Sequence, residues 1–519
     1  MSDVLVVGAG FGGIAAALRM RAKGYSVTVI DRGDQLGGRA QVFERNGFVF
    51  DAGPTVITAP FLFDELFGLF GKRTSDYVKI VPVEPWYRFY YDDGSVFNYG
   101  GTTEDTLKEI AKISPGDVDG YKRLLKTSEA IFNVGFTQLA DKPFHNFFSM
   151  LKQIPNLIRL GSYRTVWQLI AAHLKHEKLR QAFSIQPLLV GGNPFATTSI
   201  YNLIHFLERK WGIHFAIGGT GAVVDGLERL MKEQGIEIRL NETVKQLITQ
   251  NNKVVGVELE SGEQISCTMA ISNADPTHLY GKMLSRKSQR LSAKLKTQHS
   301  SFSMGLFVLY FGTRRTFHDV AHHTIWLGKR YKELLSDIFD NKILANDFSL
   351  YVHRPTATDP DMAPEGCDSF YVLSPVPNLQ ADIDWSTEGG KYAEKIIDAL
   401  DKTMMPGLRT AIVEQFHMTP ADFEKDYCST HGAGFSIAPT LMQSAWFRFH
   451  NKSEGPENLY LVGAGTHPGA GVPGVLSSAK VLEHLIPDNR SLEEANGSQP
   501  EVDVDAEERS ELCRDDRAA

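Results

Sequence analysis

The stretch Val4-Leu5-Val6-Val7-Gly8-Ala9-Gly10-Phe11-Gly12-Gly13 decides the fold of this chain. Its consecutive apolar residues predict a buried strand, and the Ala and Leu spacing of Ile14–Lys23 predicts a helix directly after it. The run between them satisfies G-x-G-x-x-G. Such glycines permit a tight turn and let the backbone approach a pyrophosphate at the helix N-terminus. We therefore expect a dinucleotide-binding unit at the start of the chain.

An acidic residue stands where this unit needs one. Tyr25–Ile30 predicts a second strand, and Asp31 ends it, about 20 residues after the glycines. There a carboxylate accepts a hydrogen bond from a ribose hydroxyl. The alternative is a glycine-rich turn that binds no ligand. It explains neither why a helix starts directly after the glycines nor why Asp31 stands at the end of the second strand. Dinucleotide binding is thus predicted at Gly8, Gly10, Gly12, Gly13, Asp31 and Arg32.

A second motif narrows the dinucleotide to FAD. The run Leu36-Gly37-Gly38-Arg39, followed by Asp51-Ala52-Gly53-Pro54, resembles the second motif of the amine-oxidase-like flavoprotein superfamily. That resemblance implies that Gly37, Gly38 and Arg39 contact the pyrophosphate and the flavin. A planar guanidinium suits phosphate oxygens.

The end of the chain repeats the pattern of a strand, a glycine-rich loop and a helix. Leu459–Val462 is the expected strand, residues 463–474 form the loop, and Val475–Leu485 is the expected helix. A helix N-terminus beside a flavin stabilises negative charge on the reduced ring. We therefore expect both ends of the chain to hold one FAD. The remaining predicted cofactor residues are Gly53, Pro54, Thr55, Val244, Gly463, Gly465, Thr466, Gly471, Val472, Pro473 and Gly474.

Five segments together look like the bacterial-type phytoene desaturase family. They are residues 6–13, 51–57, 188–196, 218–222 and 463–474, and the similarity runs from about residue 1 to residue 487. The resemblance implies that FAD accepts a hydride at N5 from an allylic carbon of phytoene, with proton loss from the neighbouring carbon, most directly giving lycopene. It also implies a lipid-dissolved polyene substrate, peripheral membrane association, and reoxidation by oxygen or a quinone.

The same resemblance leaves the substrate and the catalytic residues open. Aromatic residues crowd the middle of the chain, and Phe147, Phe148 and Asn193 are the candidates for substrate contact, although ordinary core is the simpler reading of any single Phe. Some family members carry Arg-Asp where this chain has Phe148-Ser149, so the catalytic base is unknown. His318, His322 and His323 have helical spacing but no carboxylate or Cys partner in a motif, and we expect no metal site.

The predicted fold is α/β. It combines a Rossmann-like FAD-binding domain, built from discontinuous segments, with an α+β substrate domain and a helical, membrane-facing region. The expected division is an FAD-binding domain at 1–60, 214–285 and 441–487, a helical substrate and membrane-facing region at 61–213, a substrate-binding domain at 286–440, and a disordered acidic tail at 488–519. Leu151–Ala172 is a candidate amphipathic helix for a bilayer surface, or a surface helix of a soluble domain, and Pro155 and Gly161 are expected to shorten or bend it.

Composition limits the partners. The formal net charge of -8 and pI of about 6.1 give no reason to expect nucleic-acid binding. The scattered Cys267, Cys367, Cys428 and Cys513 form no CxxC pair and fit a reducing cytoplasm. No signal peptide or spanning segment is expected, so the predicted location is the cytoplasmic side of the inner membrane, peripherally attached by mainly apolar contacts; a homo-oligomer is compatible with the sequence.

Other functions remain open at this point. The chain could desaturate another carotenoid, or take fewer steps and stop at neurosporene or zeta-carotene. A carotenoid isomerase or a flavin amine oxidase would use the same fold, and a flavin-binding scaffold without activity is the non-enzymatic alternative.

Overall fold

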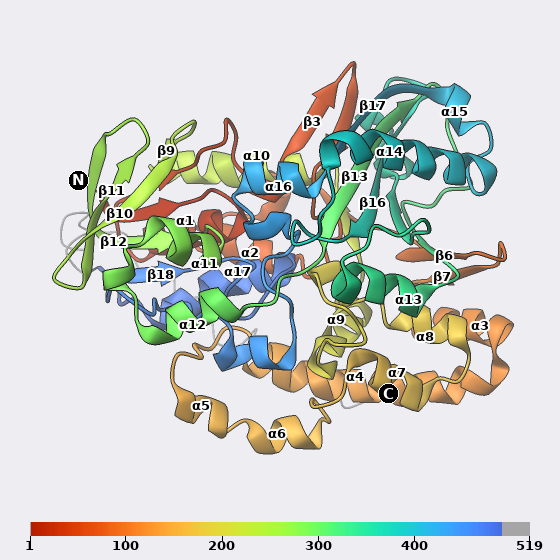
Figure 1. Cartoon of the computed structure of the whole chain (residues 1–519), viewed down its shortest axis with the longest axis horizontal. Helices are drawn as coiled ribbons and strands as arrows, with labels where there is room; N and C mark the ends of the chain where they lie inside the picture. The colour runs from red at the N-terminus through yellow and green to blue at the C-terminus, as the bar shows by residue number, and fades with distance from the viewer. Residues whose placement is uncertain (1, 490–519) are drawn as a thin grey trace.

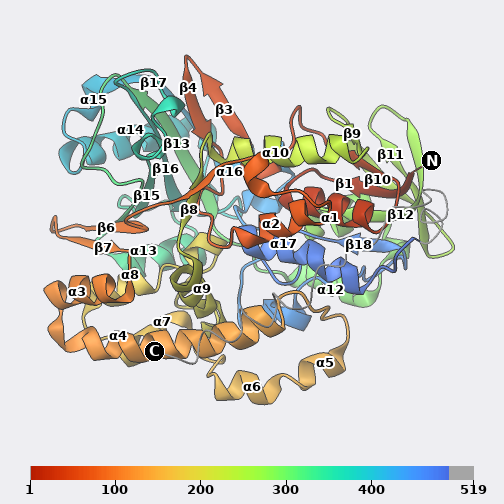
Figure 2. The same cartoon turned by 180° about the vertical axis from the view of Figure 1, so that it is seen from behind.

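The structure, a computed structural model, describes residues 2–489 except the side chains of Ser2, Phe147 and Ser149. From residue 490 onward, the predicted acidic tail lies outside the described residues. Two seven-stranded sheets stand at opposite ends of the molecule, and a group of helices lies along one side of it (Figures 1 and 2). The predicted α/β class is confirmed.

The first sheet carries the nucleotide-binding unit. Its core is parallel, in the order β18, β12, β1, β2, β9, and an antiparallel pair, β10 and β11, continues it beyond the first half of β12. The chain thus enters this sheet three times, at its start, in its middle and at its end. The strands are β1 (Ser2–Val7), β2 (Val27–Ile30), β9 (Glu237–Arg239), β10 (Val244–Gln250), β11 (Lys253–Leu259), β12 (Gln264–Ser272) and β18 (Leu459–Leu461).

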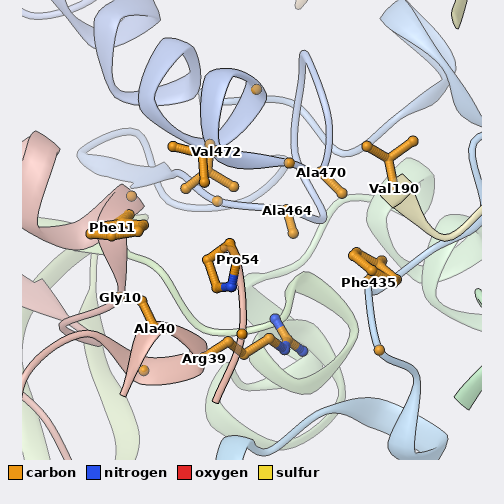
Figure 3. A pocket seen from close by; sticks show the side chains of 18 of the residues that line it. Gly10, Phe11, Arg39, Ala40, Pro54, Val190, Phe435, Ala464, Ala470 and Val472 are labelled. Atoms are coloured by element: carbon orange, nitrogen blue, oxygen red, sulfur yellow. The ribbon is translucent and has the colours of Figure 1, made fainter. Parts of the chain in front are cut away.

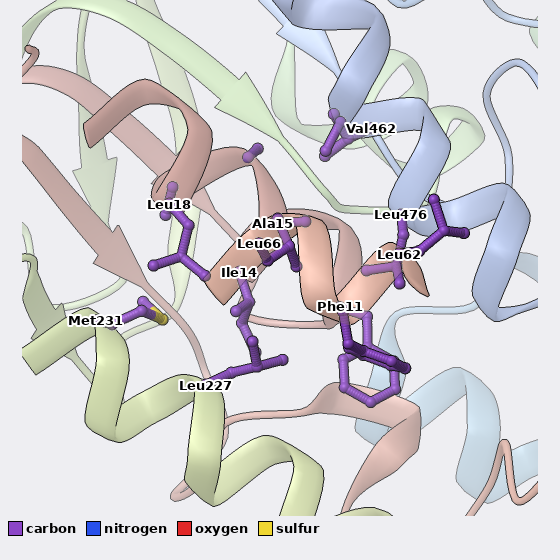
Figure 4. Packing of buried hydrophobic residues seen from close by; sticks show 14 of the residues in the cluster. Phe11, Ile14, Ala15, Leu18, Leu62, Leu66, Leu227, Met231, Val462 and Leu476 are labelled. Carbon is purple, nitrogen blue, oxygen red and sulfur yellow. The ribbon is translucent and has the colours of Figure 1, made fainter. Parts of the chain in front are cut away.

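Helix α1 (Phe11–Ala22) is the packing centre of this half. Its residues from Phe11 to Met20 are all buried, among α2 (Phe61–Gly68), α10 (Gly219–Glu233) and α17 (Val472–Lys480) (Figure 4). A helix that is apolar on every side needs neighbours on every side. The first, middle and last segments of the chain supply those neighbours.

The second sheet is mixed. Its order is β17, β13, β16, β15, β14, β6, β7, with only the pair β14 and β6 parallel. All of β13 is buried, and α14 (Trp385–Lys402) packs on the sheet through a shared apolar cluster. The strands are β6 (Tyr87–Tyr91), β7 (Val96–Tyr99), β13 (Gly305–Thr313), β14 (His323–Leu327), β15 (Leu350–His353), β16 (Asp368–Val376) and β17 (Ile412–Met418).

The region 61–213 is not purely helical as expected. It contributes β6 and β7, whose alternating burial fits strands, to the second sheet. The candidate helix over 151–172 is interrupted at one of the two positions expected to shorten or bend it, because α6 (Ile154–Arg159) ends at Arg159 and the chain turns at Gly161 with φ +66°. The helices here are α3 (Thr103–Ile113), α4 (Val118–Phe132), α5 (Phe147–Leu151), α6 (Ile154–Arg159), α7 (Val166–His173), α8 (Glu177–Phe183) and α9 (Leu203–Trp211).

The remaining elements connect the two sheets or cover them. They are β3 (Val42–Arg45), β4 (Phe48–Asp51), β5 (Ile80–Pro82), β8 (His214–Ala216), α11 (Pro276–His278), α12 (Leu291–His299), α13 (Tyr331–Ser336), α15 (Leu408–Ala411) and α16 (Pro420–Tyr427).

Truncating Leu18 on α1 tests the packing of this helix. Leu18 is fully buried, so Leu18→Ala should lower the free energy of unfolding by about 2–5 kcal/mol through lost burial and a residual cavity. The matched control, Leu291→Ala, removes the same atoms from a side chain that is 70% exposed, and should change stability by less than about 0.5 kcal/mol. Urea unfolding measures both, and equal effects would contradict the packing described.

Candidate active site

The glycine-rich turn between β1 and α1 forms one wall of a large cavity. Gly8 has φ +98°, a conformation that other residues rarely adopt. A Cβ on Gly10 would lie 2.7 Å from Asn273 Oδ1, and one on Gly12 would lie 2.7 Å from Asn273 Nδ2. Gly13 lies behind the wall, where a Cβ would meet the Gly8 carbonyl oxygen at 1.9 Å. Thus Gly10 and Gly12 leave this wall of the cavity without side chains, while Gly13 lets α1 and β1 pack closely.

Asp31 follows β2 at the polar end of the cavity. Its Oδ2 accepts from the Ala9 amide at 2.6 Å and its Oδ1 accepts from the Gly33 amide at 2.7 Å. The carboxylate therefore braces the turn and still has lone pairs for a ligand hydroxyl. Arg32 also lines the cavity, and its Nη1 lies 2.7 Å from Cys428 Sγ. Val244 lines this end as well.

Arg39 lies across the cavity from the first turn. Gly37 (φ +104°) and Gly38 (φ +57°) turn the chain there, and the Gly37 amide donates to the Ala9 carbonyl at 2.9 Å. The Arg39 Nη2 donates to Ser429 Oγ at 2.8 Å, but its Nε is buried without a partner. Burial lowers the pKa of this guanidinium. An unpartnered donor beside a cavity is what a phosphate or flavin oxygen would satisfy.

The segment after β18 closes the cavity from the other end of the chain. Gly463 has φ +104° and its amide donates to Ser478 Oγ at 2.8 Å. Helix α17 begins at Val472, so its free amides face the cavity beside Gly471, Pro473 and Gly474. Gly465 and Thr466 lie behind this lining. A Cβ on Gly465 would lie 2.3 Å from Pro276 Cδ, and the buried Thr466 hydroxyl donates to the Gly463 carbonyl.

These walls meet around Pro54. In Figure 3, Pro54 lies between Val472 at the start of α17 and the Arg39 side chain, with Phe11 on one side and Phe435 on the other. Gly53 and Thr55 line the same cavity. Gly8, Asp31, Asn273 and Gly463 each follow a parallel strand of the first sheet, which is the edge where ligands bind in open α/β sheets. Asn273 was missed from the sequence, although its place directly after the apolar end of strand β12 could have indicated it.

Beyond Pro54 the cavity continues into an apolar arm. Its lining there is mainly aliphatic and includes Leu188, Leu189, Val190, Leu203, Ile204, Leu207, Ile325 and Leu327. One carboxyl, Glu208, is fully buried in this arm, with Oε1 accepting from the Tyr87 hydroxyl at 3.2 Å. Burial raises the pKa of Glu208 to about 8, so this carboxyl is mostly protonated and uncharged at neutral pH. The arm is therefore suited to a hydrocarbon.

The predicted substrate residues do not line this arm. Asn193 is buried outside it, and its Oδ1 accepts from the Phe195 amide at 2.9 Å, which makes it a turn residue. Phe148 is 70% exposed on α5, away from the cavity, and the Phe147 side chain lies outside the described part of the chain. Aliphatic residues of 188–207 form most of this lining. Two aromatic residues of the middle region, Phe136 and Tyr201, also line the cavity.

The histidines 318, 322 and 323 do not form a helical cluster. His323 begins strand β14, and His318 is exposed in the preceding loop, so the expected helical spacing is wrong. The strand instead places His322 and His323 beside His353 of β15, and one ring nitrogen from each lies within 4.8 Å of the others. His467 is also buried, with Nε2 at 3.2 Å from the Leu139 carbonyl, and satisfies a backbone group.

Comparison with known proteins agrees with this geometry. The family model of flavin containing amine oxidoreductases matches residues 11–481. A lycopene-forming phytoene desaturase from Pantoea ananas is 47% identical over 94% of this chain and 99% of its own. The chain belongs to the phytoene desaturase family of flavin-containing oxidoreductases.

One further relative belongs to the same family, and one solved structure shares the fold. A neurosporene-forming phytoene desaturase from Rhodobacter capsulatus is 43% identical over 94% of each chain. An oxidoreductase structure from Methanosarcina mazei superimposes with a TM-score of 0.65 at 17% identity, covering 93% of this chain and 99% of that one, which shows the shared fold. The cofactor of the family is FAD. The bare glycine wall and the unpartnered Arg39 Nε fit its pyrophosphate and flavin.

Blocking the glycine wall tests the position of this site. A side chain at Gly10 would fill the approach beside Asn273, so Gly10→Val should yield folded protein that purifies without FAD. Flavin absorbance per mole of protein and circular dichroism measure the two properties. Gly116→Val is the matched control, because nothing lies within 4 Å of a Cβ there, and it should retain FAD. A Gly10→Val protein with full flavin content would place the cofactor elsewhere.

Proposed function

We propose that this protein is a lycopene-forming phytoene desaturase. The observation that carries the proposal is the single cavity, which joins the FAD-binding motifs to an apolar arm, in a chain 47% identical to a lycopene-forming enzyme over nearly its whole length. The arm offers aliphatic walls and an uncharged carboxyl, which suit a polyene better than an amine. An amine substrate would leave its cation without a partner there.

We assign FAD binding to the residues that the sequence predicted on the cavity wall. Bound FAD would accept a hydride from the substrate, and the cofactor itself supplies this chemistry. The chain's contribution is positional. Asp31 and the turn glycines orient the dinucleotide, Arg39 and the α17 N-terminus favour negative charge, and the aliphatic arm excludes water from the reacting carbons. We also propose that the segments around 1–60, 214–285 and 441–487 act as one FAD-binding domain.

The number of desaturation steps defines a second candidate. The Rhodobacter capsulatus relative is neurosporene-forming at 43% identity, close to the 47% of the lycopene-forming one. Both would use the same site and differ only in how far the polyene advances through the arm. We favour lycopene because further relatives with that product, from Pseudescherichia vulneris and a Paracoccus strain, are 46% and 45% identical. Oxygen or a quinone remains the proposed electron acceptor, and a homo-oligomer remains a prediction.

We propose that α5 and α6 rest on a lipid surface. Phe148, Leu151, Ile154, Ile158 and Tyr163 are all at least 40% exposed, and these helices lie on the outside of the molecule (Figure 1). Between Asp141 and Glu177 the sequence contains lysine and arginine but no acidic residue. Exposed apolar side chains flanked by cations are typical of peripheral attachment to anionic membranes. Within residues 2–489, no helix is long and apolar enough to cross a bilayer.

Product analysis tests the proposed activity. FAD-loaded protein given phytoene in liposomes should form a visible-absorbing product with the chromatographic identity of lycopene. Accumulation of neurosporene as the end product would support the second candidate. Flavin-loaded protein that releases peroxide with amines and leaves phytoene colourless would contradict both.

Charge substitution tests the proposed lipid surface. Ile158→Asp places a carboxylate at a side chain that is 63% exposed on α6, and should reduce co-sedimentation with vesicles containing anionic lipid. Val413→Asp is the matched control at a 53% exposed position on β17, far from α6, and should sediment like the unchanged protein. Equal vesicle binding by the unchanged protein and the Ile158→Asp variant would contradict this placement.

A further inference from the structure

A group of hydroxyls lines the cavity beside the predicted flavin residue Thr55. The Thr55 hydroxyl lies 3.0 Å from the Tyr351 hydroxyl and 3.1 Å from the Tyr371 hydroxyl. All three residues line the cavity, on the side formed by the second sheet. Burial raises the pKa of both tyrosines, so both phenols stay protonated. They are neutral polar groups in an otherwise aliphatic part of the cavity.

Tyr351 connects these hydroxyls to the buried histidines. Its hydroxyl lies 2.7 Å from His323 Nδ1. The His323 ring is 4.4 Å from the His322 ring and 5.4 Å from the His353 ring, centroid to centroid. The register of β14 and β15 fixes this grouping, because His323 and His353 are directly paired across the two strands.

The other end of the group reaches a second pocket. His322 Nδ1 lies 2.6 Å from the Thr358 hydroxyl, and both residues line that pocket. Asp361 and Glu365, which also line it, are exposed to solvent. A row of proton-exchanging groups therefore lies between the first cavity and this second pocket. Between His323 and His322 the rings are neighbours that share no hydrogen bond.

Several ring nitrogens in this group have no fixed partner. His322 Nε2, His323 Nε2 and both nitrogens of His353 are buried without a hydrogen bond. Leaving buried polar atoms unpaired is destabilising, and packing alone does not explain why several are grouped here. Burial lowers the pKa of all three rings, so they are neutral. A neutral imidazole can accept a proton on one nitrogen while it releases another from the second.

We propose that Tyr351, His323, His353 and His322 form a relay that carries the proton of each desaturation from the cavity to the second pocket. This rests on the proposed desaturase function. Bound FAD would supply the hydride acceptor, and oxygen or a quinone would be the final acceptor of the two electrons. With the hydride taken from the allylic carbon, the neighbouring C–H bond would break and its electron pair would form the new C=C bond. The proton would go to the Tyr351 oxygen while the Tyr351 O–H proton passes to His323 Nδ1.

A weak base is sufficient for this step. Hydride loss leaves positive charge spread over the polyene, so the neighbouring C–H becomes strongly acidic and a neutral phenol can take the proton. Other charged and titratable groups face the relay. The Asp51 Oδ2 lies 3.4 Å from His353 Nε2 and would stabilise a transient imidazolium, whereas Arg354 is already paired with Asp368 at 3.0 Å. Tyr87 packs against His323 with ring centroids 6.0 Å apart. Tyr351 would touch the substrate, and His323 acts through it.

Single-turnover kinetics test the relay. FAD-loaded protein is mixed anaerobically with phytoene vesicles, and flavin bleaching is followed in H2O and in D2O. We expect the unchanged protein to react more slowly in D2O. Tyr351→Phe and His323→Gln should each react roughly 100-fold more slowly, the usual size of a general acid–base contribution, and should lose that solvent isotope effect. Flavin content and thermal unfolding establish that each variant is folded and loaded.

Tyr392→Phe is the matched control. It also removes one buried hydroxyl, which lies 2.8 Å from Ser374 Oγ and outside the cavity, and it should match the unchanged protein in rate and isotope effect. Unaltered rates and isotope effects in Tyr351→Phe and His323→Gln would overturn the relay alone. Failure of the unchanged protein to bleach or form product would overturn the desaturase proposal and the relay with it. One equivalent of metal bound at the histidines, found by elemental analysis and lost in His323→Gln, would also overturn the relay.

Discussion

The close approach of backbone segments around Asn273 constrains the rest of the structure. Gly10, Gly12 and Gly463 each come so near this side chain that a Cβ would lie within 2.4 to 2.7 Å of it. The three glycines follow strands from the first and last parts of the chain, and Asn273 follows one from the middle. Because none of these glycines carries a side chain, the three segments can meet at one edge of the sheet and leave a cavity there. Because the first, middle and last segments of the chain come together here, α1 is buried on every side.

The cavity combines two environments that a desaturase needs. Its polar end offers a carboxylate, a guanidinium with an unpartnered donor and the N-terminus of α17, which suit an anionic dinucleotide. Its other end is aliphatic, and the one carboxyl there that is fully buried is held uncharged. The hydroxyls of Thr55, Tyr351 and Tyr371 lie on the side formed by the second sheet. A cofactor bound at the polar end can thus accept a hydride on one side of the substrate. The hydroxyls on the side of the second sheet can accept the proton from another side.

The sequence was most informative where backbone chemistry is local. Turn glycines, an acid after a strand and a glycine-rich loop before a helix have fixed spacings. Gly8, Asp31 and Gly471, which were predicted from these spacings, line the cavity. Gly465 and Thr466 belong to the same motif but face the protein interior, and spacing does not distinguish the two sides of a loop. The apolar arm was not predicted, because its walls come from distant segments whose short apolar runs look like ordinary core. The histidine group was misjudged for a related reason, since His353 joins it only through strand pairing.

A structure of the purified protein with its cofactor and a bound carotenoid would show whether both ends of the chain hold one FAD beside the apolar arm. FAD should extend from Asp31, past Arg39, to the α17 N-terminus, with the polyene in the arm lined by residues 188–207. FAD held by only one end of the chain, or a carotenoid bound outside this arm, would contradict this arrangement.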